Sequence, residues 1–163
     1  MSYTIRLIEP RDNAAVEAII RGCLVEFGGD HEGTAWMDPD LGRFSEVYRG
    51  EGRAYWVAED GQGRVVGGAG IGELAGVPGV CELQKMYCLR EARGTGAARQ
   101  LIDAALAFAH GRYEKCYLET LDSMKAAHRF YEKHGFHRIG APLGRTGHDG
   151  CDVLYLKELG NGE

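Results

Sequence analysis

Short apolar or alternating runs along the chain predict a set of β-strands. The first run, at 3–8, alternates polar and apolar residues with the period of two that a half-buried strand has. The other runs are apolar and are bounded by glycine, proline or polar residues. They lie at 54–59, 64–71, 80–89, 116–120, 137–139 and 152–159. A glycine-bearing connection at 60–63 joins two of them and predicts a β-hairpin.

Apolar residues at helical spacing predict helices between these strands. The first helix spans 12–27, with Asp12 as its N-cap, and its buried stripe is formed by Val16, Ile19, Ile20 and Cys23. A second helix runs from Gly96 to about 110, and its buried stripe is formed by Leu101, Ile102, Ala105, Leu106 and Ala109. A short helix at 41–48 follows a polar loop at 28–40.

A further helix is predicted over 124–134. Gly135 is placed to end this helix in a left-handed conformation, and Phe136 to pack back on its last turn. The order of elements is a strand, one or two helices, three antiparallel strands, then helix, strand, helix and two strands. Because no linker or repeat interrupts this order, we expect one mixed α/β domain over residues 1–163.

Composition narrows the range of functions. The net charge of −5 argues against binding nucleic acid through a basic face. The chain has no apolar run long enough to span a bilayer and no secretory leader, so we expect no membrane partner and a cytoplasmic location. Its five cysteines have no CxxC pair. We expect Cys81, Cys88 and Cys116 to be reduced and to act as small hydrophobic residues in strands.

The glycine-rich turn at 93–98 carries the main chemical signal. It lies between a strand and a helix, where free backbone N–H groups and the helix dipole favour a phosphate or pyrophosphate. A P-loop would need GxxxxGK[ST], which the chain lacks, and a dinucleotide-binding turn would need a small residue where Arg99 stands. Two possibilities remain: the turn binds the pyrophosphate of coenzyme A, or it is a tight turn that binds nothing.

In the turn at 93–98 and in a second segment at 126–136, the chain resembles the GNAT acetyltransferase superfamily. Arg93, Gly96 and Ala98 match the superfamily motif [Q/R]xxGx[G/A], after the expected strand. The run AAHRFYEKHGF at 126–136 matches a second segment, with Tyr131 in register. The resemblance implies the GNAT fold, an α/β (α+β) architecture with a single mixed, mostly antiparallel sheet of about six to seven strands flanked by about four helices.

The resemblance also implies an acetyl-CoA site. The backbone around Met86 and Cys88 would bind the pantetheine arm like an added strand. Backbone amides of the turn would bind the pyrophosphate, and the cofactor residues so implied are Arg93, Gly94, Thr95, Gly96, Ala97, Ala98 and Arg99. One residue departs from the family. Met124 stands where many members have an asparagine that contacts the cofactor arm, and Ser123 could replace that contact.

Acetyl transfer to an amine poses two proton problems. The amine must lose its proton before it can attack, because an ammonium with a pKa of about 10.4 has no lone pair. The departing thiolate must then gain a proton. The family resemblance makes Tyr131 the candidate general acid, with a tyrosine that only packs in the core as the alternative. Glu82 is the candidate base, with Glu119 or a water chain as alternatives. A cysteine nucleophile is disfavoured, since no cysteine has an adjacent histidine and acid.

The remaining candidates are weaker. A zinc site would draw on the histidines and one cysteine near the C-terminus, but the ligand spacing is incomplete and we expect no metal; these residues are His128, His134, His137, His148 and Cys151. We expect the loop at 144–152 to border the acceptor. Trp36, Tyr55 and Trp56 line a pocket or pack in the core.

The sequence thus predicts an acetyltransferase that moves an acetyl group from acetyl-CoA to a primary amine of a small molecule or peptide, in a ternary complex. The alternatives are a hydroxyl acceptor or a non-catalytic module that binds coenzyme A. A nicotinamide-dependent oxidoreductase is disfavoured by Arg99. A homodimer formed through the C-terminal strands is a further expectation from the family.

Overall fold

The computed structural model describes residues 2–160, and its centre is a seven-stranded sheet with the order β1-β2-β3-β4-β5-β7-β6. All neighbours are antiparallel except β4 and β5, which are parallel. The strands are β1 (Thr4–Leu7), β2 (Ala54–Glu59), β3 (Val65–Glu73), β4 (Val80–Cys88), β5 (Lys115–Thr120), β6 (His137–Ile139) and β7 (Val153–Glu158). The predicted strands and the mixed, mostly antiparallel sheet are confirmed.

Four α-helices accompany the sheet in the described part of the chain: α1 (Asn13–Glu26), α2 (Phe44–Val47), α3 (Ala97–Ala109) and α4 (Lys125–Lys133). Helix α2 is shorter than the predicted 41–48, and the predicted loop contains one 3₁₀ turn (Ala35–Met37). Two more 3₁₀ turns precede α1 (Pro10–Asp12) and α3 (Arg90–Ala92). None of the helices within residues 2–160 has the length and apolar character that crossing a membrane requires.

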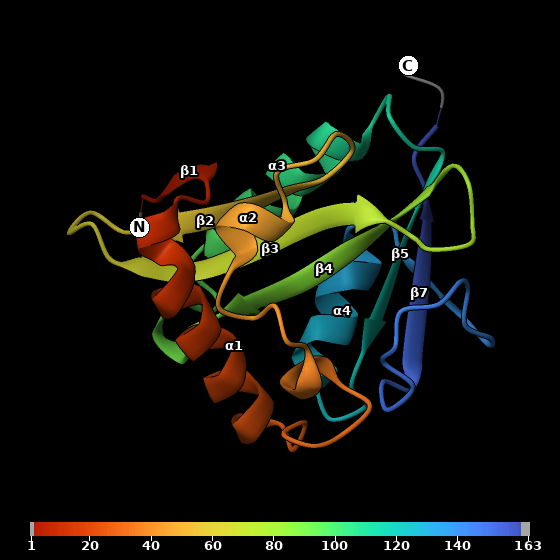
Figure 1. The fold of residues 1–163 in the computed structure, drawn as a ribbon, viewed down its shortest axis with the longest axis horizontal. Helices are drawn as coiled ribbons and strands as arrows, with labels where there is room; N and C mark the ends of the chain where they lie inside the picture. The colour runs from red at the N-terminus through yellow and green to blue at the C-terminus, as the bar shows by residue number, and fades with distance from the viewer. Residues whose placement is uncertain (1, 161–163) are drawn as a thin grey trace.

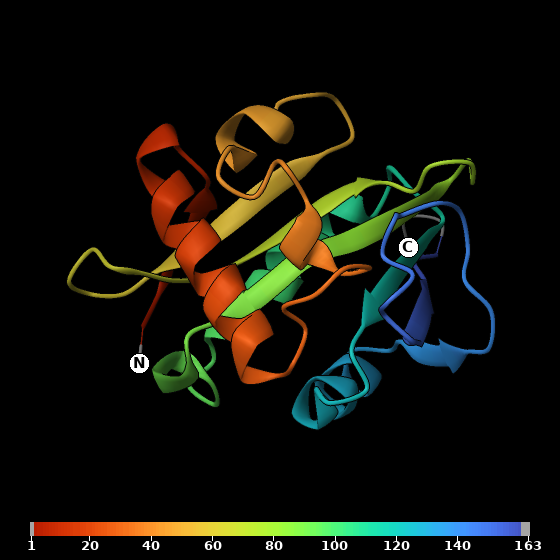
Figure 2. The same cartoon turned by 60° about the horizontal axis from the view of Figure 1, so that its bottom comes forward.

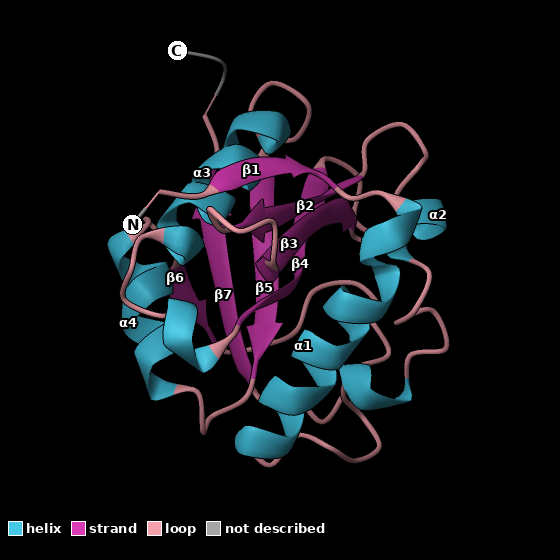
Figure 3. Ribbon diagram, turned by 90° about the vertical axis from the view of Figure 1, so that its left-hand side faces the viewer, coloured by secondary structure: helices cyan, strands magenta, loops and turns pink. Residues whose placement is uncertain are grey.

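The helices cover both faces of the sheet, so the protein has a core on each side (Figures 1 and 3). Helices α3 and α4 bury Leu101, Ile102 and Tyr131 against one face. Helices α1 and α2 bury residues such as Ile20 and Phe44 against the other. As predicted, Gly135 ends α4 with a φ of 88°, and the ring of Phe136 lies 5.9 Å from that of Tyr131.

The sheet opens between β4 and β5. Their parallel register runs only from the Val80–Lys115 pair to the Glu82–Tyr117 pair, after which the strands diverge (Figure 1). On its other side β4 carries a bulge, because the single residue between Gly68 and Gly70 faces two residues between Gln84 and Tyr87. The first of those two is Lys85, whose left-handed φ of 52° is rare outside glycine.

The bulge is held by Tyr55 from β2. Its hydroxyl donates a hydrogen bond of 2.8 Å to the carbonyl oxygen of Lys85. The ring can lie across β3 only because glycines face it: a Cβ at Gly68 or Gly70 would approach the Tyr55 ring to 2.6 or 2.7 Å. Tyr55 therefore packs in the core, and the glycines of β3 make room for it.

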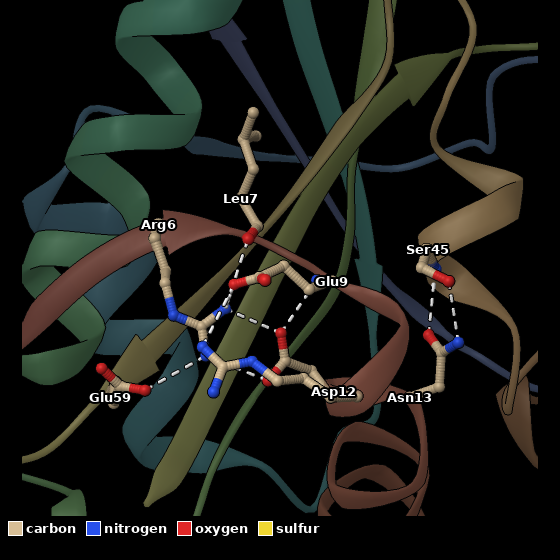
Figure 4. Close-up of polar contacts among 8 residues, drawn as sticks. Arg6, Leu7, Glu9, Asp12, Asn13, Ser45 and Glu59 are labelled. Atoms are coloured by element: carbon tan, nitrogen blue, oxygen red, sulfur yellow. Dashed lines mark hydrogen bonds and ion pairs between the residues drawn. The ribbon is translucent and has the colours of Figure 1, made fainter. Parts of the chain in front are cut away.

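A buried ion pair joins β1 to the start of α1. The guanidinium of Arg6 donates to both carboxylate oxygens of Asp12 at 2.7 and 3.0 Å and to Glu59 of β2 at 3.2 Å (Figure 4). As predicted, Asp12 is the N-cap residue of α1, but its side chain does not cap the helix. Its carboxylate makes no cap hydrogen bond to that helix and instead accepts one from the backbone N–H of Glu9. The pair with Arg6 turns the carboxylate away from the helix.

We expect Asp12→Asn to lower the free energy of unfolding by about 3 kcal/mol, because it leaves the half-buried Arg6 without its closest anion. Burial opposes ionisation of Asp12, but the hydrogen bonds from Arg6 and from the Glu9 backbone outweigh it and lower the pKa of the carboxyl. The stabilisation is therefore present at neutral pH and is lost as the pH falls below about 4.

Urea unfolding at several pH values measures this effect. Asp122→Asn is the matched control, because the Asp122–Lys125 pair is exposed on both sides and should contribute less than about 1 kcal/mol. Equal losses in the two variants would contradict the role given to Asp12.

Candidate active site

The gap between β4 and β5 leads into a cavity of about 260 Å³. Its walls come from β4, the turn before α3, α4 and the end of α1, and they are mainly apolar. The lining residues are Cys23, Phe27, Met86, Tyr87, Cys88, Arg93, Gly94, Ala98, Met124, Ala126, Ala127, Phe130 and Tyr131. The structure thus brings together six residues predicted from the sequence, namely Met86, Cys88, Arg93, Gly94, Ala98 and Tyr131. We call this space the cofactor cleft.

The turn at the entrance of the cofactor cleft has the conformation that its glycines allow. Gly94 and Gly96 have φ values of 75° and 98°, and Gly96 is the N-cap of α3. No side chain closes over them, since a Cβ at Gly94 would meet nothing within 4 Å. The first N–H groups of α3 have no acceptor within the helix, so they are available to an anion.

The other predicted turn residues lie at the edge of the cofactor cleft. The hydroxyl of Thr95 donates to the carbonyl of Ala92 and lies 2.7 Å from the hydroxyl of Tyr3. Ala97 is buried under the helix, and Arg99 lies on its first turn. The side chains of Thr95 and Ala97 thus help to shape the turn.

Arg93 is already paired with a carboxylate. Its guanidinium donates to both oxygens of Glu26 at 2.8 and 2.9 Å, and its Nε donates to the carbonyl of Cys88 at 3.2 Å. Hydrogen bonds from Arg93, assisted by Arg90, lower the pKa of Glu26 to about 2. The Arg93 side chain thus ties α1 to the end of β4, and its charge is largely balanced. Its backbone belongs to the glycine turn that precedes α3.

Tyr131 lies on α4 and faces the cofactor cleft from within the core. Aromatic rings of Phe130, Phe136 and Tyr155 surround it, with centroids 5.7 to 6.2 Å away. Within residues 2–160 its hydroxyl forms no hydrogen bond. Burial raises the pKa of Tyr131, so the phenol keeps its proton at all ordinary pH values.

Met124, at the position of the family asparagine, is buried between the cofactor cleft and a second cavity. Its sulfur accepts a hydrogen bond of 3.4 Å from the Thr120 hydroxyl. Ser123 does not take the asparagine's place, since its hydroxyl donates to the carbonyl of Phe27 at 2.7 Å. The side chain at 124 therefore contributes apolar surface.

The second cavity lies on the other side of Met124 and Tyr87, which line both spaces. It is smaller, at about 40 Å³, and more polar. Its polar walls are formed by Thr34, Glu82, Gln84, Lys85, Glu119, Thr120, His148 and Cys151. We call it the polar cavity. The polar cavity adjoins the cofactor cleft at Tyr87 and Met124, so a molecule bound in one would lie next to a molecule bound in the other.

Glu82 is the most buried carboxylate of the polar cavity, with a relative exposure of 8%. Its Oε1 accepts a hydrogen bond of 2.8 Å from Nε2 of Gln84. Burial raises the pKa of Glu82, and the Gln84 hydrogen bond opposes that change without cancelling it. The carboxylate is therefore a stronger base than an exposed glutamate.

Glu119, the alternative base, has partners for both of its oxygens. Oε2 accepts from the Tyr117 hydroxyl at 2.7 Å, and Oε1 accepts from the Thr146 hydroxyl at 2.6 Å. These bonds join β5 to the loop before β7. Both carboxylate oxygens of Glu119 are therefore engaged by hydroxyl donors.

Two loops far apart in the sequence meet over the polar cavity (Figures 1 and 2). His148 Nε2 lies 2.9 Å from both carboxylate oxygens of Asp38, and Lys85 Nζ lies 2.8 Å from one of them. The backbone N–H of Gly150 donates to the carbonyl of Gly33 at 2.7 Å. Burial opposes ionisation of Asp38, but His148 and Lys85 outweigh it and lower its pKa.

The histidines do not assemble a metal site. Among residues 2–160 no three His, Cys, Asp or Glu side chains are grouped so that they could hold an ion. The ring of His128 lies 3.0 Å from the carbonyl of Leu121, and that of His134 lies 2.9 Å from the carbonyl of Phe130. Trp36 and Trp56 line neither cavity. Trp36 lies under the guanidinium of Arg21, and Trp56 packs on Phe108.

Several residues of the site carried no signal in the sequence. Gln84, Lys85 and Asp38 were not predicted, because a single polar residue on a strand or in a loop is ordinary. The sequence did predict that the loop containing His148 would border the acceptor, and His148 lies in the wall of the polar cavity.

Comparison with known proteins places this geometry in a family. The family model of the GNAT acetyltransferase domain matches residues 51–138. An N-acetyltransferase of Escherichia coli K12, YjgM, named as uncharacterized, is 42% identical over 97% of this chain and 96% of its own. The chain therefore belongs to the GNAT acetyltransferase family.

Solved structures have the same fold. A GNAT-family acetyltransferase from Staphylococcus aureus Mu50 superposes with a TM-score of 0.87 at 21% identity, covering 98% of this chain and 100% of that one. A phosphinothricin acetyltransferase from Sinorhizobium meliloti, solved in complex with acetyl-CoA, gives a TM-score of 0.75 at 20% identity, covering 99% and 91%.

We expect Asp38→Asn to loosen the loop at 144–152, since it removes the anion that holds His148 and Lys85. Backbone amides of that loop should exchange hydrogen about tenfold faster. Hydrogen-exchange mass spectrometry measures this change. Asp40→Asn, which breaks an exposed pair with Arg43 in the same region, is the matched control and should leave the loop unchanged. Equal exchange in both variants would contradict the bridging role of Asp38.

Proposed function

We propose that this acetyltransferase moves an acetyl group from acetyl-CoA to a primary amine of a small molecule or peptide, by direct transfer within a ternary complex. The observation that carries the proposal is the junction of two cavities at Tyr87 and Met124, one apolar and beside a glycine turn, the other polar and lined by carboxylates. When bound, acetyl-CoA supplies the acetyl group as an activated thioester.

The cofactor cleft suits acetyl-CoA in shape and chemistry. Beyond Glu82 the backbone of β4 has no partner in β5, so Met86 can hydrogen-bond an extended amide-bearing arm. The carbonyl of Cys88 already accepts from Arg93 and from Cys23, which makes Met86 the better partner. The open turn at 94–99 offers N–H groups at the start of α3 to the pyrophosphate.

The charges of the polar cavity favour a cationic acceptor. Lys85 and His148 share the carboxylate of Asp38, so these groups largely offset one another. Glu82 and Glu119 then leave the cavity with a negative balance. An ammonium group is attracted to such a site, and a buried carboxylate of raised pKa can remove its proton.

Tyr131 and Glu82 divide the two proton transfers. Glu82 takes the proton of the acceptor amine, which frees the lone pair for attack. Tyr131 keeps its own proton and can donate it to the departing sulfur. They reach the reaction from the two sides of the junction, because Tyr131 lines the cofactor cleft and Glu82 lines the polar cavity.

Calorimetric titration with acetyl-CoA, CoA and NADH tests the donor. We expect the first two to bind and NADH not to. Gly96→Val should abolish binding, because its side chain would stand in the open turn and its φ of 98° is strained for valine. Gly63→Val is the matched control, since Gly63 has a φ of 81°, open space around it and a place in the distant β2–β3 hairpin. Retained binding in Gly96→Val would contradict this placement.

Tyr131→Phe should lower kcat about 100-fold, the range expected for losing a general acid, and leave the Kd of acetyl-CoA nearly unchanged. Steady-state assays with amine acceptors measure kcat. Tyr155→Phe is the control, because it also removes a buried hydroxyl, one that donates to Glu132 and lines neither cavity. If kcat does not change in Tyr131→Phe, the tyrosine is not the acid. Parallel assays with hydroxyl acceptors test O-acetylation.

A further inference from the structure

Glu82 is not held by its own strand alone, because a chain of side chains reaches it from α2. Tyr48, the residue after α2, donates its hydroxyl hydrogen to Oε1 of Gln84 at 2.7 Å. Gln84 then donates from Nε2 to Oε1 of Glu82 at 2.8 Å. The order is thus hydroxyl, amide and carboxylate, with each group donating to the next.

We propose that Gln84 is a positioning residue for acetyl transfer, which Tyr48 orients so that its amide N–H holds Glu82 in the ionised, proton-accepting form. This inference rests on the proposed function, in which Glu82 is the base. The hydrogen bond leaves Oε2 of Glu82 to face the acceptor. Gln84 does not touch the reacting atoms and acts only through Glu82.

The direction of the amide follows from what each group can donate. A phenol with a raised pKa keeps its proton, and Tyr48 is such a phenol because it is buried. Its donated hydrogen fixes the carbonyl end of Gln84 toward Tyr48, which leaves the NH₂ end toward Glu82. The opposite orientation would place the amide oxygen against a carboxylate oxygen, two acceptors without a hydrogen. The arrangement therefore favours the carboxylate.

The surrounding fold makes this orientation rigid. The ring of Tyr48 packs 5.3 Å from those of Phe44 and Tyr55, so its hydroxyl has little freedom. Gly70 and Gly72 on β3 leave the space that the two polar side chains occupy. A Cβ at Gly70 would approach Tyr48 to 3.0 Å, and one at Gly72 would approach Oε1 of Gln84 to 2.9 Å.

Other charged and titratable groups also act on Glu82. They come from β4, from β5, from the loop before β7 and from the segment after α2, and they are Lys85, Glu119, Tyr117, Cys116, His148, Cys151 and Tyr48. Lys85 and His148 favour the ionised carboxylate, and Glu119 disfavours it. Gln84 alone donates a hydrogen bond to it among the described residues.

The test is the pH dependence of kcat/KM for acetylation of an amine. Gln84→Met keeps the length of the side chain and removes the donor. We expect its acidic limb to move to higher pH, which lowers kcat/KM about tenfold on that limb while the plateau changes less. Tyr48→Phe keeps the Gln84 amide but no longer fixes its orientation. The acidic limb of the Tyr48→Phe profile should therefore move to higher pH, but less far than that of Gln84→Met. A purely structural role would lower the melting temperature without moving the limb.

Tyr117→Phe separates this inference from its alternative. It removes a hydroxyl donor from Glu119 just as Gln84→Met removes an amide donor from Glu82. An unmoved limb in Gln84→Met together with a moved limb in Tyr117→Phe would overturn the inference and assign the base to Glu119. The ¹³C-carboxyl NMR titration of Glu82 in the resting protein gives a readout without activity, and an equal titration in wild type and Gln84→Met would also overturn it.

Failure of the proposed function has a different signature. Wild-type protein that binds acetyl-CoA and acetylates no amine would overturn the function. Active wild-type protein whose acidic limb is the same in Gln84→Met would overturn only the positioning role.

Discussion

The site depends on the bulge in β4. A straight β4 would continue its parallel ladder with β5 and close the gap that now opens into both cavities. The bulge places Lys85 in a left-handed conformation, at a cost of about 1–3 kcal/mol. The Tyr55 hydroxyl, which holds the Lys85 carbonyl, helps to offset this cost, and the glycines of β3 are needed to seat the Tyr55 ring. Core packing on one face thus shapes the chemistry in the middle of the sheet.

Burial raises the pKa of one group on each side of the gap, a phenol on one side and a carboxyl on the other. Tyr131 sits among aromatic rings without a hydrogen bond in the described part of the chain, and burial there keeps its proton on. Glu82 is also buried, but burial raises the basicity of a carboxylate. Burial therefore raises the pKa of both groups: the phenol stays protonated, and the carboxylate becomes more basic. The hydrogen bond from Gln84 opposes the second effect, because it favours the ionised carboxylate.

The sequence was sufficient to predict the fold and one half of the site. Strand and helix periodicity and the glycine turn at 93–98 are local patterns, so the sheet, α3 and α4 followed from them. Glu82, Glu119 and the loop containing His148 were also named from the sequence, but the contacts that bring them together in the polar cavity are long-range and were not predictable in this way. His148 and Asp38 are 110 positions apart, and Tyr48 and Gln84 are 36 apart. Asp12 stands at the predicted N-cap, but its carboxylate pairs with Arg6, six positions away, and makes no cap hydrogen bond to α1.

The size of the polar cavity limits how an acceptor can enter. At about 40 Å³ it has room for only a small group, whereas the cofactor cleft is several times larger. The bulk of a larger acceptor must therefore lie outside, against the two loops that meet above Glu82. These loops are joined by few bonds, chiefly the Asp38–His148 pair and the Gly150–Gly33 backbone contact. Because loops vary while a sheet stays fixed, under the proposed function residues 31–43 and 144–152 are the part of the site where selectivity for the acceptor would reside.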